Sequence, residues 1–176
     1  MTKKIKCIHV GLGNFSLQRI QLNLDNNLFE VVAFVDIDIS NTIDNLKKLK
    51  NLPKDFEKRI FKSISAAQKK YSAEVCFIYV ASEAHPELII ESLENNLHTF
   101  CVKSIACEMS DFKKIMKMSK TSFLESCEIT INSTIRRLSM LEGKNKKALE
   151  SEFREWIDAI QSEDKNYDFL YINKIN

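Results

Sequence analysis

The stretch from residue 5 to residue 38 constrains the fold of this chain more than any other part of the sequence. It begins with an apolar run, and a short turn containing Gly11 and Gly13 follows. A helical pattern then leads to a second apolar run, 29–35, which ends next to Asp36. Continuous apolar runs are typical of strands buried in a parallel sheet, and parallel strands need a crossover such as a helix. We therefore expect an α/β fold that begins with strand, turn, helix and strand.

The spacing within this stretch predicts a site for a dinucleotide. Gly11 allows a tight turn, and Gly13 allows the backbone to approach a pyrophosphate at the positive end of the next helix. Asp36 comes 20 residues after Ser16, where an acid can accept hydrogen bonds from a ribose diol. Ser16 replaces the third glycine of the usual motif, and its small side chain still suits close packing of helix on strand. Two alternatives stay open: a turn that binds nothing, and a methyltransferase-type turn, since those folds also carry an acid after their second strand.

The residues at the end of the second strand bear on the choice between NAD and NADP. The carboxylate of Asp36 would repel a 2′-phosphate. The next residue is Ile37 rather than an arginine that could pair with that phosphate. The sequence therefore favours NAD over NADP.

Composition excludes several classes of partner. The chain has 176 residues and a net charge of +2, which gives no argument for nucleic acid or an anionic membrane. Its five cysteines form no C-x-x-C pair, so neither a metal site nor a disulfide framework is expected. A reducing, cytoplasmic setting follows from this cysteine usage. The start of the chain does not read as a signal peptide, and no apolar stretch is long enough to span a membrane.

Apolar runs alternate with helical periodicity along the rest of the chain, which predicts a doubly wound parallel sheet with helices on both faces. Strands are expected at 5–10, 29–35, 60–61, 75–81, 99–102, 128–131 and 169–172. Helices are expected at 16–24, 41–49, 65–71, 86–95, 110–119 and 146–161. The run 75–81 is apolar throughout, so we expect it to be buried on both faces. His9, inside the first strand, is expected to be a core histidine whose hydrogen bonds are satisfied.

Four motifs in order resemble the Gfo/Idh/MocA family of oxidoreductases. They are the turn at 11–14 with Asp36, the stretch 80–85, the stretch 93–100, and Val102-Lys103-Ser104 in the place of a Glu-Lys-Pro signature. Members of that family have a Rossmann domain for NAD or NADP, followed by a substrate domain. The resemblance therefore implies a Rossmann domain at 1–122 and the truncated start of a second domain at 123–176.

The resemblance also implies roles for individual residues. Those that would hold the cofactor, from its pyrophosphate to its nicotinamide, are Gly11, Gly13, Asn14, Phe15, Asp36, Ala81, Ser82 and His85. Lys103 would be catalytic, positioning substrate or assisting proton transfer. Val102 and Ser104 replace the glutamate and proline of the signature, and serine lacks the preference of proline for a cis peptide bond that would aim the lysine.

The implied reaction is hydride transfer between the nicotinamide and a hydroxyl-bearing carbon of a sugar or cyclitol. No counterpart of the family's later Asp-and-His motif follows residue 122, so we expect dinucleotide binding with impaired catalysis. The alternative is a non-enzymatic dinucleotide sensor or interaction protein on the same fold. An unpaired apolar edge at 169–172 would favour a homo-oligomer.

Overall fold

The computed structural model describes residues 3–102 and 104–118 of the chain. The chain divides into two compact units, Met1–Cys101 and Val102–Asn176. The first unit contains the sheet, and the described part of the second unit contains helix α5 (Met109–Met118). The elements predicted at 128–131, 146–161 and 169–172 lie outside the described residues. The domain boundary at residue 122 and the homo-oligomer therefore stay predictions.

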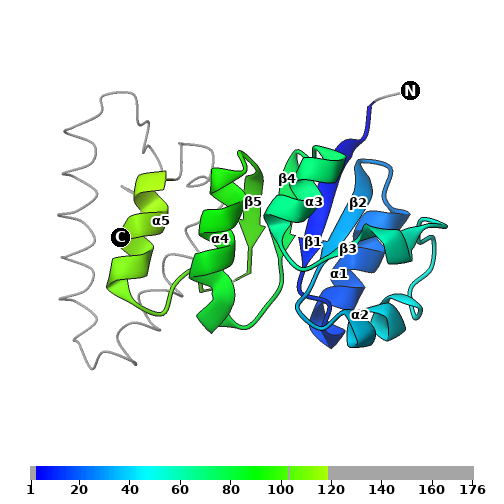
Figure 1. The fold of residues 1–176 in the computed structure, drawn as a ribbon, viewed down its shortest axis with the longest axis horizontal. Helices are drawn as coiled ribbons and strands as arrows, with labels where there is room; N and C mark the ends of the chain where they lie inside the picture. The colour runs from blue at the N-terminus through cyan, green and yellow to red at the C-terminus, as the bar shows by residue number, and fades with distance from the viewer. Residues whose placement is uncertain (1–2, 103, 119–176) are drawn as a thin grey trace, which may run out of the picture. The chain divides into compact units, whose positions relative to one another are not determined.

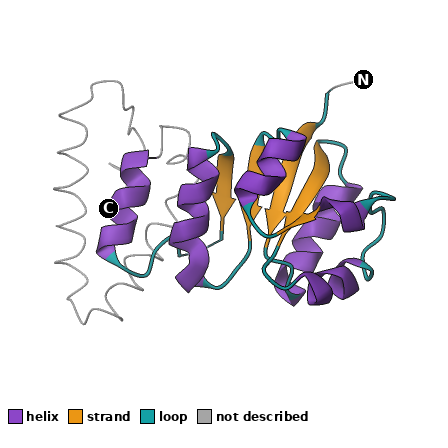
Figure 2. Cartoon of the chain, in the orientation of Figure 1, coloured by secondary structure: helices purple, strands orange, loops and turns teal. Residues whose placement is uncertain are grey.

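The first unit is built on a parallel sheet, drawn in orange in Figure 2. Its described strands are ordered β3-β2-β1-β4-β5. These strands are β1 (Ile5–Val10), β2 (Phe29–Val35), β3 (Ile60–Phe61), β4 (Val75–Ile78) and β5 (His98–Cys101). The chain moves outward from β1 to β3 and then returns to β4 on the other side of β1. Such a reversal of strand order defines a doubly wound sheet, so the predicted fold class is confirmed.

Helices connect the strands and cover the sheet (Figure 1). They are α1 (Asn14–Asp25), α2 (Ile39–Leu46), α3 (Ile64–Tyr71) and α4 (His85–Glu94), with short 3₁₀ helices η1 (Phe56–Arg59) and η2 (Ser82–Ala84). Right-handed crossovers in opposite directions place α1 and α2 on one face and α3 and α4 on the other. In agreement with this, α3 packs against α4.

Side-chain caps begin two of these helices. The Asp38 carboxylate accepts a hydrogen bond from the backbone N–H of Asn41 at α2, and the Ser63 hydroxyl accepts one from that of Ala66 at α3. Such a cap stabilises a helix by about 1 kcal/mol. Helix α1 begins at Asn14, two residues before its predicted start, and its N-cap is Gly13 without a side-chain bond.

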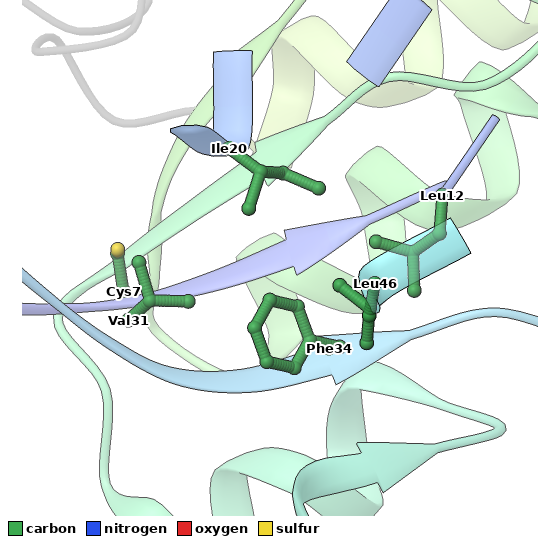
Figure 3. Packing of buried hydrophobic residues seen from close by; sticks show 6 residues of the cluster. All are labelled: Cys7, Leu12, Ile20, Val31, Phe34 and Leu46. Atoms are coloured by element: carbon green, nitrogen blue, oxygen red, sulfur yellow. The ribbon is translucent and has the colours of Figure 1, made fainter. Parts of the chain in front are cut away.

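The core on the α1 face joins the sheet to the first two helices (Figure 3). Cys7, Val31 and Phe34 from β1 and β2 pack with Ile20 of α1 and Leu46 of α2. Leu12, from the turn after β1, belongs to the same cluster. Full burial of a large aliphatic side chain stabilises a fold by about 1.5–3 kcal/mol, so this cluster fixes the turn to both helices.

Strand β4 differs from its prediction in length and burial. It ends at Ile78, three residues early, because η2 follows soon after it. Cys76 and Ile78 are buried, but Phe77 on the opposite face is only half-buried. The Phe77 ring packs edge-on against Phe29 at 5.4 Å between centroids and lies 5.7 Å from Phe100, whose side chain is 47% exposed. The expectation of burial on both faces was wrong, because a continuous apolar run does not distinguish a face under a helix from a face covered by neighbouring rings.

Two buried thiols belong to the core. Burial raises the pKa of both Cys7 and Cys76 to about 12, so each is protonated and packs as a small apolar group. Across residues 3–102 and 104–118, no three histidine, cysteine or acidic side chains gather as metal ligands do. Over the same ranges, no helix combines the length and apolarity that a membrane span requires.

Candidate functional site

Gly11 adopts a backbone conformation that the fold requires. Its φ is +84°, a region that side chains with a Cβ rarely adopt. A Cβ at this position would lie 2.5 Å from the carbonyl oxygen of Tyr79 and 2.6 Å from Cγ1 of Val80. The backbone that follows β4 therefore passes directly over the turn that follows β1, and only glycine leaves room for it.

Gly13 is different, because nothing in the fold requires a glycine there. Its φ of −75° and ψ of 172° are open to any residue, and a Cβ would meet no atom within 4 Å. Gly13 is exposed at the N-terminal end of α1. The missing side chain thus leaves open space beside the positive end of a 12-residue helix.

Among the described residues, backbone donors without a partner begin helix α1 next to Gly13. The N–H groups of Ser16 and Leu17 donate to the Gly13 carbonyl, and the buried Ser16 hydroxyl donates to the same oxygen at 2.7 Å. The N–H groups of Gly13, Asn14 and Phe15 meet no acceptor within the described part of the chain. Donors of this kind at a helix start suit a phosphate or another anion.

Asp36 lies at the same place, as its spacing predicted. It follows β2, and its Oδ2 accepts a hydrogen bond of 2.8 Å from the backbone N–H of Leu12 in the glycine turn. Its Oδ1 accepts a longer bond of 3.1 Å from the N–H of Asp38. A carboxylate has about four acceptor sites, so about two remain for outside donors. The carboxylate therefore both fixes the turn and keeps capacity to bind a diol.

Asn45 is a residue of this site that the sequence did not single out. Its side chain, on α2, is only 6% exposed and donates a hydrogen bond of 2.9 Å to the carbonyl of Leu12. The one available signal was a polar residue beside Leu46 on the buried stripe of α2, and such a position does not reveal a partner 33 residues away.

The backbone after β4 carries three of the implied cofactor residues. Ala81 is exposed and Ser82 half-buried, and both follow the Tyr79–Val80 segment that covers Gly11. The side chain of His85 is wholly buried, and its Nε2 lies 3.0 Å from the Val80 carbonyl oxygen. Because a carbonyl only accepts, Nε2 carries the proton and donates. His85 thus holds the shape of its own loop, and its contact with a nicotinamide stays a prediction.

An aromatic group lies beside the turn. Phe15 is 59% exposed at the start of α1, and the guanidinium of Arg19 lies 5.7 Å from its ring centroid. Tyr79 stacks on His9 at 5.9 Å between centroids, and burial raises the pKa of Tyr79 to about 12. An exposed aromatic ring next to an open anion site can contact the flat part of a ligand.

His9 is a core histidine, as predicted, but its hydrogen bonds are not all satisfied. Its Nε2 lies 3.2 Å from the Asn23 amide nitrogen, which donates, so Nδ1 carries the ring proton. Nδ1 has no acceptor within the described part of the chain. Burial lowers the pKa of His9 to about 3, so the ring is neutral at physiological pH.

Lys103, the predicted catalytic residue, lies outside the described residues. Its role stays a prediction.

The fold and the turn together define an α/β protein of the Rossmann type. The family model for an oxidoreductase family with an NAD-binding Rossmann fold matches residues 5–123. The chain belongs to this family, the Gfo/Idh/MocA oxidoreductases. The resemblance seen in the sequence is therefore confirmed, and the match sets aside the methyltransferase-type turn.

Solved structures share this fold. Myo-inositol 2-dehydrogenase from Lactobacillus plantarum matches with a TM-score of 0.56 and 20% identity over 66% of this chain and 33% of that chain. The WlbA dehydrogenase from Chromobacterium violaceum, in complex with NADH and UDP-GlcNAcA, has a TM-score of 0.56 and 20% identity over 67% and 32%. A variant of KijD10, a 3-ketoreductase from Actinomadura kijaniata bound to TDP-benzene and NADP, has a TM-score of 0.54 and 12% identity over 66% and 35%. This chain thus spans about a third of the length of these structures.

Proposed function

We propose that this chain binds NAD, with the pyrophosphate at the turn 11–15 and the adenosine ribose on Asp36. The observation that carries the proposal is the open space at Gly13. It adjoins three backbone donors and lies on a turn that the Asp36 carboxylate holds through Leu12. The fold does not need glycine at this position, whereas a pyrophosphate in close contact with the backbone does.

NAD rather than NADP is the proposed cofactor. Asp36 lies at the ribose position, and a second carboxylate, that of Asp38, follows two residues later. Ile37 between them is 87% exposed and offers no positive charge to a 2′-phosphate. Two carboxylates without a neighbouring arginine disfavour that phosphate by charge repulsion. Since family structures contain NADH or NADP, the choice depends on these residues rather than on the family.

The proposed reaction is hydride transfer to or from a sugar or cyclitol. The nicotinamide supplies the hydride chemistry, and the protein supplies binding, orientation and proton transfer. In this proposal Asn14 and Phe15 line the pyrophosphate. Ala81, Ser82 and His85 border the nicotinamide half, and Lys103 holds or moves the proton of the substrate hydroxyl.

A non-enzymatic dinucleotide sensor is the second candidate. It is favoured by Val102 and Ser104, which replace the residues that flank the lysine in the family signature. The two candidates agree on NAD binding and differ on turnover. Incubation with NAD and a panel of polyols and sugars, read at 340 nm, separates them. Turnover abolished by Lys103→Met supports the enzyme, and tight NADH binding without turnover supports the sensor.

The binding proposal is tested by filling the open space. Gly13→Val places two methyl groups where the pyrophosphate would lie, while the backbone dihedral angles suit valine and its Cβ meets no atom within 4 Å. We expect at least 100-fold weaker NADH binding, measured by fluorescence titration, with a melting temperature that falls by only a few degrees, because Gly13 is the N-cap of α1. Gln18→Val, exposed farther along α1, is the matched control and should bind as the parent does. Equal NADH affinity in the parent and Gly13→Val would reject the proposal, and S-adenosylmethionine serves as the unrelated ligand.

A further inference from the structure

Leu12, between the two glycines, is fixed in place by its side chain, its backbone N–H and its backbone carbonyl. Its side chain is 2% exposed and packs in the core cluster with Ile20 and Leu46 (Figure 3). Its N–H donates to Asp36 at 2.8 Å, and its carbonyl accepts from the Asn45 amide at 2.9 Å. The turn therefore has one residue fixed on all sides, directly before the residue that borders the open space.

The Asn45 amide can present only its nitrogen to this carbonyl. The ammonium of Lys48, two residues past the end of α2, donates to Oδ1 of Asn45 at 2.6 Å. An ammonium has no acceptor, so it selects the amide oxygen and leaves the NH₂ group for Leu12. Lys48, Asn45, Leu12 and Asp36 thus form one chain of hydrogen bonds at the turn, in which Asn45 lies on α2 and Asp36 directly after β2.

The consequence for the site follows from the geometry of the peptide bond. The Leu12 carbonyl and the Gly13 N–H belong to the same planar trans peptide, so they point in opposite directions. Holding the carbonyl toward α2 fixes the Gly13 N–H on the side away from α2. Without the Asn45 donor, a buried carbonyl would lack a partner, and rotation of this peptide toward water would turn the N–H with it.

We propose that Asn45 is a positioning residue that aims the Gly13 N–H at the pyrophosphate of the cofactor. This inference rests on the proposed function, because it names a residue of α2 that acts on the same phosphate site through the backbone of Leu12. Asn45 itself touches no ligand. Lys48 acts one step earlier, by selecting the orientation of the amide.

The test replaces the amide donor of Asn45 with side chains of similar size. Asn45→Asp retains the acceptor for Lys48 but sets a carboxylate oxygen against the Leu12 carbonyl, and Asn45→Leu removes the donor without adding charge. We expect each to weaken NADH binding about 10-fold, as loss of one buried hydrogen bond does. Asn41→Asp adds the same charge at an exposed position of α2 and should stay within about 2-fold. Lys48→Met, which leaves Asn45 in place, should weaken binding about 3-fold and serves if the Asn45 variants fold poorly.

A second readout does not depend on the ligand. The chain has 3 glycines, so ¹⁵N-glycine labelling gives three amide signals, from Gly11, Gly13 and Gly143. We expect the Gly13 signal of the free protein to move in both Asn45 variants and in Lys48→Met, while the Gly143 signal stays in place. A melting temperature that falls while the Gly13 signal and the NADH affinity stay constant would reduce Asn45 to a packing role and overturn the inference. If the parent binds no NADH although the Gly13 signal responds, the proposed function fails and the control of the turn by Asn45 stands.

Discussion

The turn after β1 and the loop after β4 touch each other, yet they use their polar groups in opposite ways. In the turn after β1, the side chains of Asp36, directly after β2, and of Asn45 on α2 hold Leu12, and the next three N–H groups meet no acceptor within the described part of the chain. In the loop after β4, the His85 ring is buried and binds the carbonyl of Val80 in the same loop. The first region leaves backbone donors available, as the proposed dinucleotide site requires, whereas the second uses its buried imidazole to hold its own loop.

The largest effect is expected where the two regions meet. Gly11→Ala places a methyl group 2.5 Å from the Tyr79 carbonyl oxygen in a residue whose φ is +84°. We expect the free energy of unfolding to fall by about 3 kcal/mol, from backbone strain and overpacking together. Urea denaturation measures it, and Gly13→Ala is the control that should lose no more than about 1 kcal/mol, the cost of alanine at the N-cap of α1. Equal losses at the two glycines would remove the distinction between them.

His9, in β1 and stacked on Tyr79, should make the stability of the fold sensitive to acid. Burial lowers its folded pKa to about 3 from an ordinary value of 6.5, so the unfolded chain binds a proton that the folded chain does not. Its contribution to stability is complete above pH 6.5 and declines as pH falls toward 3. At pH 5 the loss is about 2 kcal/mol. Urea midpoints between pH 7.5 and 5 measure it, and His9→Leu should flatten this part of the profile; an unchanged slope would contradict the assignment.

Substitutions of His85 test whether the loop after β4 serves its own stability rather than ligand binding. His85→Leu fills similar space but leaves the Val80 carbonyl without the imidazole N–H, so we expect about 1–2 kcal/mol less stability. His85→Gln, which can still donate, should recover part of it in thermal denaturation. A variant with full stability and weakened NADH binding would instead show that the second region is also arranged for the ligand.

The smallest expected effect concerns cofactor choice. Asp36→Asn removes the charge that opposes a 2′-phosphate and keeps an oxygen for the Leu12 N–H. We expect the preference for NADH over NADPH to fall about 10-fold, a change of about 1.4 kcal/mol. Paired titrations with both cofactors measure the ratio, and Asp38→Asn reports how much the second carboxylate contributes. A ratio that does not respond to Asp36→Asn would mean that the acid discriminates nothing.

The sequence predicted what depends on local spacing. The bounds of β1 and β2 and the convergence of Gly11, Gly13 and Asp36 follow from glycine, apolar runs and a fixed interval, all visible along one stretch of chain. The roles of Asn45 and His85 could not be read in this way. Asn45 meets Leu12 only through the packing of α2, and His85 is buried because η2 turns it back onto Val80.

The partial exposure of the β4 face that carries Phe77 shows a further limit of prediction from the sequence. A run of apolar residues records that a strand avoids water, but it does not record what covers each face. The Phe77 face is covered in part by rings from β2 and β5, and this depends on strand register. The unpaired Nδ1 of His9 is likewise a property of neighbours that only the folded chain brings together.

The unconstrained backbone at Gly13 has an evolutionary consequence. One nucleotide substitution converts a glycine codon to an alanine codon, and the structure has room for the added methyl group at this position. A descendant of this gene could therefore lose the proposed dinucleotide site in a single generation and still encode a folded polypeptide. Selection for stability alone would have little effect on such a change, so retention of glycine at this position in a lineage would support selection for the proposed ligand.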